Sequence, residues 1–404
     1  MLGPDRLSGR LLGLMAASVG AIVANIYYAQ PLLPDIARTF GLSATGIGIF
    51  AMLNPAGAGL GQLLFVPLGD IRERRGMITV MILGAAVALA LTASARNTEW
   101  LMASALLVGM TASINHVIIP FAAQLAPPEQ RGRAVGIVIS GLLIGVLVAR
   151  TFSGYLGALF GWRVVFATAS VFMLILAILL RSSLPKSVPT VKLSWPQLIA
   201  SAVPLWRGLP VLREAVFTSA LMFAVFSGFW TAVVFFVEGP PFYFTSRGAG
   251  LLSLIGAAGA LIAPFAGRVA DRRGGRSSVL AGMAAMAVSF VVLGLLGARL
   301  WGLIAGVILL DLAMQVCHVT NQTRIYALVP EARSRLNMIY MTSTFSCGAL
   351  GSYLSTYWWH RSGWWGVCGF SLAISAIALI GGWQLGRQGH ETVPETLPDK
   401  GLPS

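Results

Sequence analysis

Long uninterrupted stretches of apolar residues dominate this chain of 404 residues. A membrane-spanning helix needs about 20 mostly apolar residues. Strands of a transmembrane barrel would alternate polar and apolar residues, whereas these stretches are continuous. Because a helix satisfies its own backbone groups in lipid, the sequence predicts an all-α membrane protein. The twelve predicted spans are residues 11–31, 45–69, 77–95, 100–124, 134–158, 162–181, 213–237, 248–269, 277–298, 300–324, 336–358 and 362–386.

Composition excludes several classes of protein. Only 10% of the residues are charged, against roughly 25% in an ordinary soluble domain, which rules out a soluble enzyme, a disordered chain and a coiled coil. The sequence contains no Walker loop, dinucleotide fingerprint or zinc-ligand spacing, so we expect neither an enzyme nor a bound cofactor or metal. The three cysteines lie inside apolar stretches and are interpreted as packing residues: Cys317, Cys347 and Cys368.

The positions of Lys and Arg predict how the chain lies in the membrane. Short cytoplasmic loops carry more of these residues than outer loops do. With a cytoplasmic N-terminus, 21 of the 28 basic residues fall in cytoplasmic segments and 6 in outer ones, while Arg150 lies inside a span. We therefore expect a multi-pass protein of the bacterial inner membrane with both termini in the cytoplasm. The net charge of +14 then reflects topology, and no nucleic-acid partner is expected.

The chain repeats itself at an offset of 201 to 202 residues. The matches include His116 with His318, Asp70 with Asp271, and PEQRGR at 128–133 with PEARSR at 330–335. They predict two six-helix halves related by pseudo-symmetry, an arrangement of many secondary transporters whose substrate site lies between the halves. Cleavage of the first span as a signal peptide is not expected, because it would break this symmetry. The predicted parts are the halves 1–181 and 213–386, a proline-rich cytoplasmic linker at 182–212 and a cytoplasmic tail at 387–404.

Two loops at equivalent positions resemble the signature loops of the major facilitator superfamily. GRVADRRGGR at 267–276 fits the pattern G-x-x-x-D-R-x-G-x-R, and VPLGDIRERR at 66–75 keeps the acidic residue and a basic pair but has Val66 and Glu73 in place of glycines. The resemblance covers nearly the whole chain, and it implies that these loops stabilise the outward-facing state. The candidate loop residues are Asp70, Arg74, Arg75, Gly267, Asp271, Arg272, Gly274 and Arg276.

The fifth predicted span resembles the glycine-rich motif of the twelve-helix drug:proton antiporter branch. It contains Gly136, Gly145 and Gly154, although Ala149-Arg150 stands where that motif has Gly-Pro. Residues 28–37 resemble the same branch, whereas Ala105 stands where the branch has an Arg in helix 4. The resemblance implies a transporter driven by a proton gradient, with helices 1, 4, 7 and 10 lining the cavity.

Two charged residues lie deep inside the predicted spans. An ionisable group in lipid costs a few kcal/mol by insertion scales, so Asp311 in span 10 and Arg150 in span 5 are candidate coupling residues. An Arg side chain or a bound substrate could bridge them. The alternatives are that Arg150 snorkels or pairs with Asp35 or Glu238 near the outer surface, and that Asp311 is a static structural acid.

Span 10 carries a polar stripe at helical spacing, formed by Asp311, Gln315, His318 and Gln322. Such a stripe favours a cavity or a partner helix over lipid. His116 and His318 are candidates for proton transfer, because histidine titrates near neutrality; packing with one hydrogen bond is the alternative, and a metal site is not expected. The candidate cavity-lining residues are Asn25, Tyr28, Asn115, Gln315, Gln322 and Trp230.

Together these features predict a secondary active transporter that works by alternating access. We expect proton-coupled efflux of small amphipathic organic compounds by a monomer in the lipid bilayer. Protonation of Asp311 would weaken its pairing with Arg150 and shift the populations of the two states. The alternative function is proton-coupled uptake of a small carboxylate or sugar, with Arg150 clamping the substrate. A receptor or scaffold without transport activity is a further alternative.

Overall fold

The computed structural model describes residues 8–189, 194–256, 275–329 and 332–391. Within these ranges the fold is entirely helical, and ten helical segments are long and apolar enough to cross a membrane. The last segment breaks at Ser362 and Gly363 and so forms two spans. The predicted span 248–269 is helical over its described part, from residue 246 to 256. The predicted twelve-helix membrane fold therefore agrees with the structure.

Most predicted spans match one helix, but three are divided. The first covers α1 and the start of a 3-10 turn, the second covers α3 and the start of α4, and the fourth covers α6 and α7, which are separated at Ser113 and Ile114. In chain order the elements are α1 Gly9–Tyr27, η1 Gln30–Leu32, α2 Leu33–Phe40, α3 Ala44–Leu64, α4 Leu68–Ile71, α5 Arg74–Ala93, α6 Thr98–Ala112, α7 Asn115–Leu125, η2 Pro128–Gln130, α8 Arg131–Phe160, α9 Trp162–Ser183, α10 Trp195–Ala200, α11 Ala202–Gly208, α12 Pro210–Glu238, α14 Gly275–Leu296, α15 Leu300–Tyr326 and α16 Arg333–Glu391.

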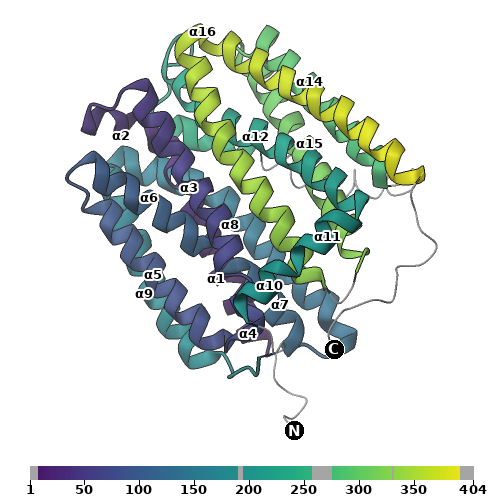
Figure 1. Cartoon of the computed structure of the whole chain (residues 1–404). Helices are drawn as coiled ribbons and strands as arrows, with labels where there is room; N and C mark the ends of the chain where they lie inside the picture. The colour runs from purple at the N-terminus through teal and green to yellow at the C-terminus, as the bar shows by residue number, and fades with distance from the viewer. Residues whose placement is uncertain (1–7, 190–193, 257–274, 330–331, 392–404) are drawn as a thin grey trace.

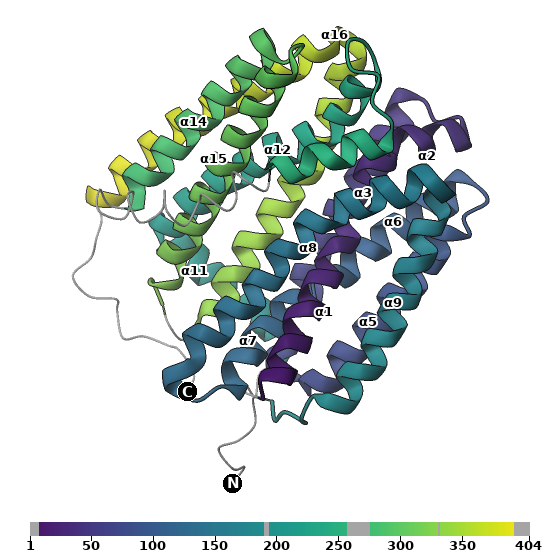
Figure 2. The same ribbon diagram turned by 180° about the vertical axis from the view of Figure 1, so that it is seen from behind.

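Two groups of helices lie side by side, one made of the elements up to α9 and the other of those from α12 onwards (Figures 1 and 2). They meet along α3 and α16, and along α8 and the helical residues 246–256. We call the end of the bundle that carries α2 the α2 end, and the opposite end, where α1 begins, the N-terminal end. By the predicted topology these are the outer and cytoplasmic ends.

Both halves of the sequence repeat make the same kind of turn at the α2 end. Gly161 and Gly363 have φ angles of +83° and +59°, a region that favours glycine because a Cβ would be strained there. Each glycine precedes a buried tryptophan. The indole of Trp162 donates to Thr39, and that of Trp364 donates to the carbonyl of Leu293. The matched Gly-Trp pairs therefore turn the chain and anchor it in the same way.

The segment between the two groups forms two short helices, α10 and α11, and contacts both groups. The indole of Trp195 donates to the carbonyl of Leu64 at the end of α3, at 3.0 Å. α11 packs against α12 and α16, where Leu205 and Leu209 join a small apolar cluster. The division of the chain at 182–212 into two halves stays a prediction.

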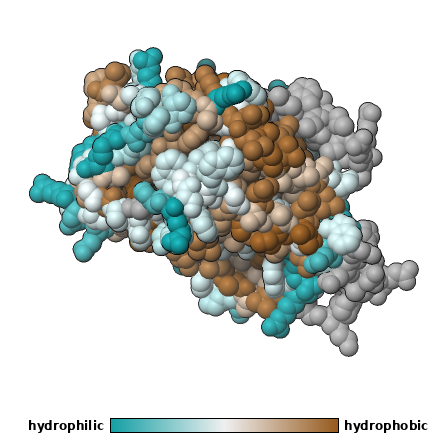
Figure 3. Space-filling model, turned by 90° about the horizontal axis from the view of Figure 1, so that it is seen from above, coloured by the Kyte–Doolittle hydropathy of each residue, from teal (hydrophilic) through white to brown (hydrophobic). Residues whose placement is uncertain are grey.

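The outer surface of the bundle is apolar, as expected for contact with lipid. Many large hydrophobic side chains are exposed, among them Val80 on α5, Ile178 on α9 and Ile380 on α16. Seen from above, brown hydrophobic areas cover much of the surface, and hydrophilic side chains lie scattered between them (Figure 3). In a soluble protein such a surface would drive aggregation.

Substituting Gly145 is expected to disrupt the packing of α1 against α8. A Cβ on Gly145 would lie 2.1 Å from the carbonyl oxygen of Gly20, and backbone cannot move aside as a side chain can. We expect Gly145→Val to destabilise the protein by about 1–3 kcal/mol or more, measured by thermal unfolding in detergent. Gly136→Val, on the same helix with no atom within 4 Å of its Cβ position, is the matched control. Equal midpoints for the two variants would contradict this reading.

Candidate substrate and coupling site

Arg150 lies in the interior of the protein, on α8. Its side chain is buried, with 4% of the residue exposed, and its Nε donates to Oε1 of Gln30. The guanidinium carbon lies 4.6 Å from the ring centroid of Tyr27 and 4.2 Å from that of Trp230. Aromatic faces attract a cation, so two rings and one amide hold this charge. Nη2 has no hydrogen-bond partner among the described residues.

Asp311 lies close to Arg150 without forming an ion pair with it in the described structure. The acid is 8% exposed, and its Oδ2 has no hydrogen-bond partner there. A Cβ on Gly256 would lie 2.6 Å from this oxygen and 3.1 Å from Cζ2 of Trp230, so the carboxylate and the indole edge share one small space. The two charged residues predicted as coupling residues therefore lie near each other in the fold.

The alternative partners considered for Arg150 are wrong. Asp35 and Glu238 both pair with Arg38 at the α2 end, where Arg38 joins α2 to the end of α12. Asp35 also accepts a hydrogen bond from the hydroxyl of Ser246. These contacts tie the two groups of helices together at the α2 end, away from Arg150.

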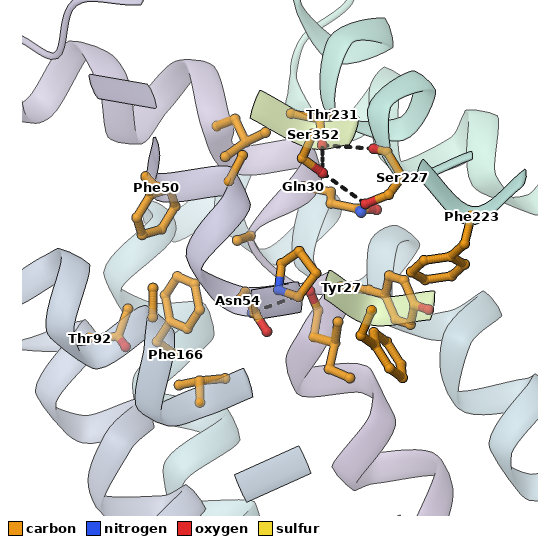
Figure 4. A pocket seen from close by; sticks show the side chains of 18 residues that line it. Tyr27, Gln30, Phe50, Asn54, Thr92, Phe166, Phe223, Ser227, Thr231 and Ser352 are labelled. Carbon is orange, nitrogen blue, oxygen red and sulfur yellow. Dashed lines mark hydrogen bonds between the residues drawn. The ribbon is translucent and has the colours of Figure 1, made fainter. Parts of the chain in front are cut away.

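A cavity lies between the two groups of helices, next to residues that contact Arg150. Tyr27 and Gln30, which both contact Arg150, lie on its wall. Figure 4 shows Phe50 and Phe166 on one side and Phe223 on another. Its polar groups include the linked hydroxyls of Ser227, Thr231 and Ser352, and Asn54, whose Oδ1 has no partner among the described residues. The cavity is thus mostly apolar, with a few polar groups, as small-molecule sites are.

The predicted cavity-lining residues are not on the wall of this cavity. Asn25 contacts Met173 of α9, and Tyr28 packs near Phe152 of α8, so both face the first group of helices. Trp230 is 2% exposed, with its ring against the guanidinium of Arg150 and its edge near the carboxylate of Asp311. Their assignment as substrate contacts stays a prediction. Of the others, Asn115 is buried, Gln315 is half-buried and Gln322 contacts Tyr326.

The two histidines of the repeat interact across the boundary between the groups of helices. His116 and His318 are close enough for an electrostatic interaction. Nδ1 of His116 lies 3.4 Å from Nδ2 of Asn337, and Nδ1 of His318 lies 3.3 Å from the hydroxyl of Tyr340. Both partners are on α16. A proton-transfer role for the pair stays a prediction, and no cluster of three metal-ligating side chains occurs in the described part of the chain.

The first signature loop forms a local network at the N-terminal end. Arg74 is buried and donates to the carbonyl of Gly69 and to Gln124, and it pairs with Asp70 at 3.2 Å. Arg75 is half-buried at the start of α5. Glu73, which replaces a glycine of the family pattern, caps α5. Burial alone would raise the pKa of Glu73, but N–H groups of Gly76, Ser187 and Arg75 donate to its carboxylate and hold that pKa below its usual value.

The second signature loop is described only at its last two residues, Gly275 and Arg276. Gly267, Asp271, Arg272 and Gly274 lie outside the described residues. Nη2 of Arg276 donates to the carbonyl of Trp383, at 2.7 Å.

Glu214 forms a buried charge cluster that the sequence did not predict. It is 4% exposed on α12, it pairs with Arg324 of α15 at 2.7 Å, and its other oxygen lies 3.8 Å from Arg276. In the sequence, Glu214 is an acidic residue at the edge of an apolar stretch, where the other stretches have mostly basic residues. This difference was the signal from which the cluster could have been predicted.

Comparison with known proteins shows the family to which the chain belongs. The chain is 40% identical to the putative uncharacterized transporter YgaY of Escherichia coli over 378 residues, covering 94% of this chain and 96% of that protein. It is 33% identical to the probable transporter SCO4007 of Streptomyces coelicolor over 385 residues, covering 94% and 88%. The fold resembles an inward-facing, occupied bacterial homologue of the human lysosomal transporter Spinster, with a TM-score of 0.72 and 15% identity over 97% and 98% of the two chains. Because the Major Facilitator Superfamily profile matches residues 15–262, the chain belongs to that family and is a multi-pass membrane transporter.

Proposed function

We propose that this transporter couples the efflux of small amphipathic organic compounds to the inward movement of protons by alternating access. The observation that carries the proposal is the pair of buried charges, Asp311 and Arg150, which lie near each other without an ion pair in the described structure. Two residues that contact Arg150, Tyr27 and Gln30, lie on the wall of a mostly apolar cavity. Burying a carboxylate oxygen without a hydrogen-bond partner costs free energy, and binding of a proton would neutralise its charge. Such a group is therefore a candidate for a functional role.

The direction of transport is proposed from the motifs. The glycine pattern of α8 and residues 28–37 resemble the drug:proton antiporter branch, whose members export their substrates. We further propose that the protein works as a monomer in the cell inner membrane with both termini cytoplasmic, so that the N-terminal end faces the cytoplasm. The loop around Asp70 and Arg74 would then act at the cytoplasmic face.

Proton movement in everted membrane vesicles tests this function. The vesicle interior is acidified, and lipophilic cations, carboxylates, amino acids and sugars are added in turn while interior pH is followed by fluorescence quenching. Alkalinisation by one class of compound, absent from vesicles without the protein, is the expected result. No response to any class, with the protein shown to be folded and inserted, would refute proton-coupled export.

A cross-link at the α2 end is expected to stop turnover. Alternating access requires this end to open, and the hydrogen bond between Asp35 and Ser246 spans the two groups of helices there. Oxidation of Asp35→Cys/Ser246→Cys should therefore abolish transport, and a reductant should restore it. Each single cysteine variant under the same oxidant is the control. Undiminished transport by a fully cross-linked sample would show that the α2 end does not have to open.

A further inference from the structure

We propose that the substrate is a small zwitterion with an apolar side chain, of the α-amino acid class, whose carboxylate binds Arg150 and whose ammonium binds Asp311. This inference rests on the proposed transport function and specifies its substrate class. It follows from the hydrogen-bonding state of Arg150 and Asp311, from the balance of their charges and from the walls of the adjoining cavity.

The free edge of Arg150 fits a carboxylate. Nε and Nη2 lie side by side on a guanidinium, and together they bind a carboxylate through two parallel hydrogen bonds. Here Nε donates to the neutral amide oxygen of Gln30, and Nη2 has no partner among the described residues. Because Gln30 also lies on the cavity wall, its amide oxygen occupies the place that one oxygen of a ligand carboxylate would take. A ligand that displaces Gln30 would satisfy both nitrogens and neutralise the guanidinium.

Asp311 supplies the complementary acceptor. Its Oδ2 is buried and has no partner in the described structure, although it lies beside the indole edge of Trp230. The guanidinium of Arg150 lies over the ring face of the same Trp230. Tyr27, whose ring centroid lies 4.6 Å from the guanidinium carbon of Arg150, is on the cavity wall. Trp230 therefore contacts both charged groups, and a ligand that enters beside Tyr27 would approach Arg150 first.

Charge balance favours a zwitterion over a simple ion. The site holds one positive and one negative group, and uncompensated charge is expensive in a membrane interior. An organic cation would add positive charge beside Arg150, and an organic anion would add negative charge beside Asp311. A molecule with both charges leaves the site neutral. Its ammonium and a proton would compete for Asp311, which links substrate release to proton entry as the proposed exchange requires.

The cavity accounts for the apolar part of the substrate. Its wall carries Phe50, Phe166 and Phe223. The hydroxyls of Ser227, Thr231 and Ser352 on this wall are already paired with one another. An aliphatic or aromatic side chain would bury apolar surface there without leaving these hydroxyls unpaired.

Three matched ligands test the inference on the purified full-length protein. L-Phenylalanine carries both charges, L-phenylalaninamide only the positive one, and 3-phenylpropionate only the negative one. Binding to wild-type protein in lipid nanodiscs is measured by isothermal titration calorimetry. We expect L-phenylalanine to bind about tenfold more tightly than either analogue, since each analogue loses hydrogen bonds to one charged group. Equal or tighter binding of either analogue would overturn the inference. The inference would also fall if neither L-phenylalanine nor L-leucine binds.

Two variants test which charged group of the ligand binds Arg150 and which binds Asp311. Arg150→Gln should remove the preference for L-phenylalanine over its amide, and Asp311→Asn should remove the preference over 3-phenylpropionate. Arg299→Gln and Glu99→Gln, both exposed, are the matched controls and should keep both preferences. Wild-type selectivity decides the inference even if a variant does not fold. Proton movement driven by another class of compound would leave the transport function standing while this substrate class falls.

Discussion

Vesicles that carry Asp311→Asn are expected to show no substrate-dependent proton movement, whereas wild-type vesicles respond. Asparagine keeps the size of the side chain but cannot exchange a proton, and Asp311 is a buried acid near Trp230 and Arg150 in the described structure. Interior pH in everted vesicles, followed by fluorescence quenching, measures the effect. We expect the response to fall to the level of vesicles without the protein.

Two controls make this result interpretable. Glu99→Gln removes an acid from an exposed position and should leave proton movement unchanged. Size-exclusion chromatography of purified Asp311→Asn checks that the variant is folded. Unchanged proton coupling in a folded Asp311→Asn protein would show that another group carries the proton, and the histidine pair would then be the next target.

The fold could be predicted from the sequence because lipid leaves a chain few choices. Continuous apolar stretches must form helices there, so the spans follow from hydropathy alone. Local breaks could not be predicted in the same way. The 3-10 turn at Gln30–Leu32 contains Pro31, which has no backbone N–H to donate, whereas α6 and α7 separate at Ser113 and Ile114, where no proline or glycine marks the break.

The candidate site was predicted in part. Arg150 and Asp311 stand out in any reading, because charges are rare inside spans. Their neighbours on α1 and η1 do not stand out, since polar residues occur on more than one face of this segment. Asn25 and Tyr28 face other helices of the first group, while Tyr27 and Gln30 reach Arg150 and the cavity. Only packing against the second group of helices distinguishes these faces.

Glu214 shows a further limit of sequence reasoning. Its partner Arg324 is 110 residues away, at the far end of another span. Both residues lie near the N-terminal end of the bundle, where the sequence offers many basic residues as partners. The excess of positive charge at that end predicts the orientation of the chain in the membrane. It does not predict which Arg forms an ion pair with an isolated acidic residue.

Replacing Glu214 alone is expected to destabilise the protein strongly, whereas replacing both Glu214 and Arg324 is not. Breaking a buried ion pair leaves an uncompensated charge and costs about 3–5 kcal/mol, while replacing both partners with apolar residues of similar volume is often neutral. We therefore expect Glu214→Met to lower the midpoint of thermal unfolding in detergent, and Glu214→Met/Arg324→Met to recover most of the loss. Arg276, 3.8 Å from Glu214, also donates to the carbonyl of Trp383, a contact that neither variant alters directly. If the double variant is as unstable as Glu214→Met, the cluster stabilises the fold by more than charge compensation.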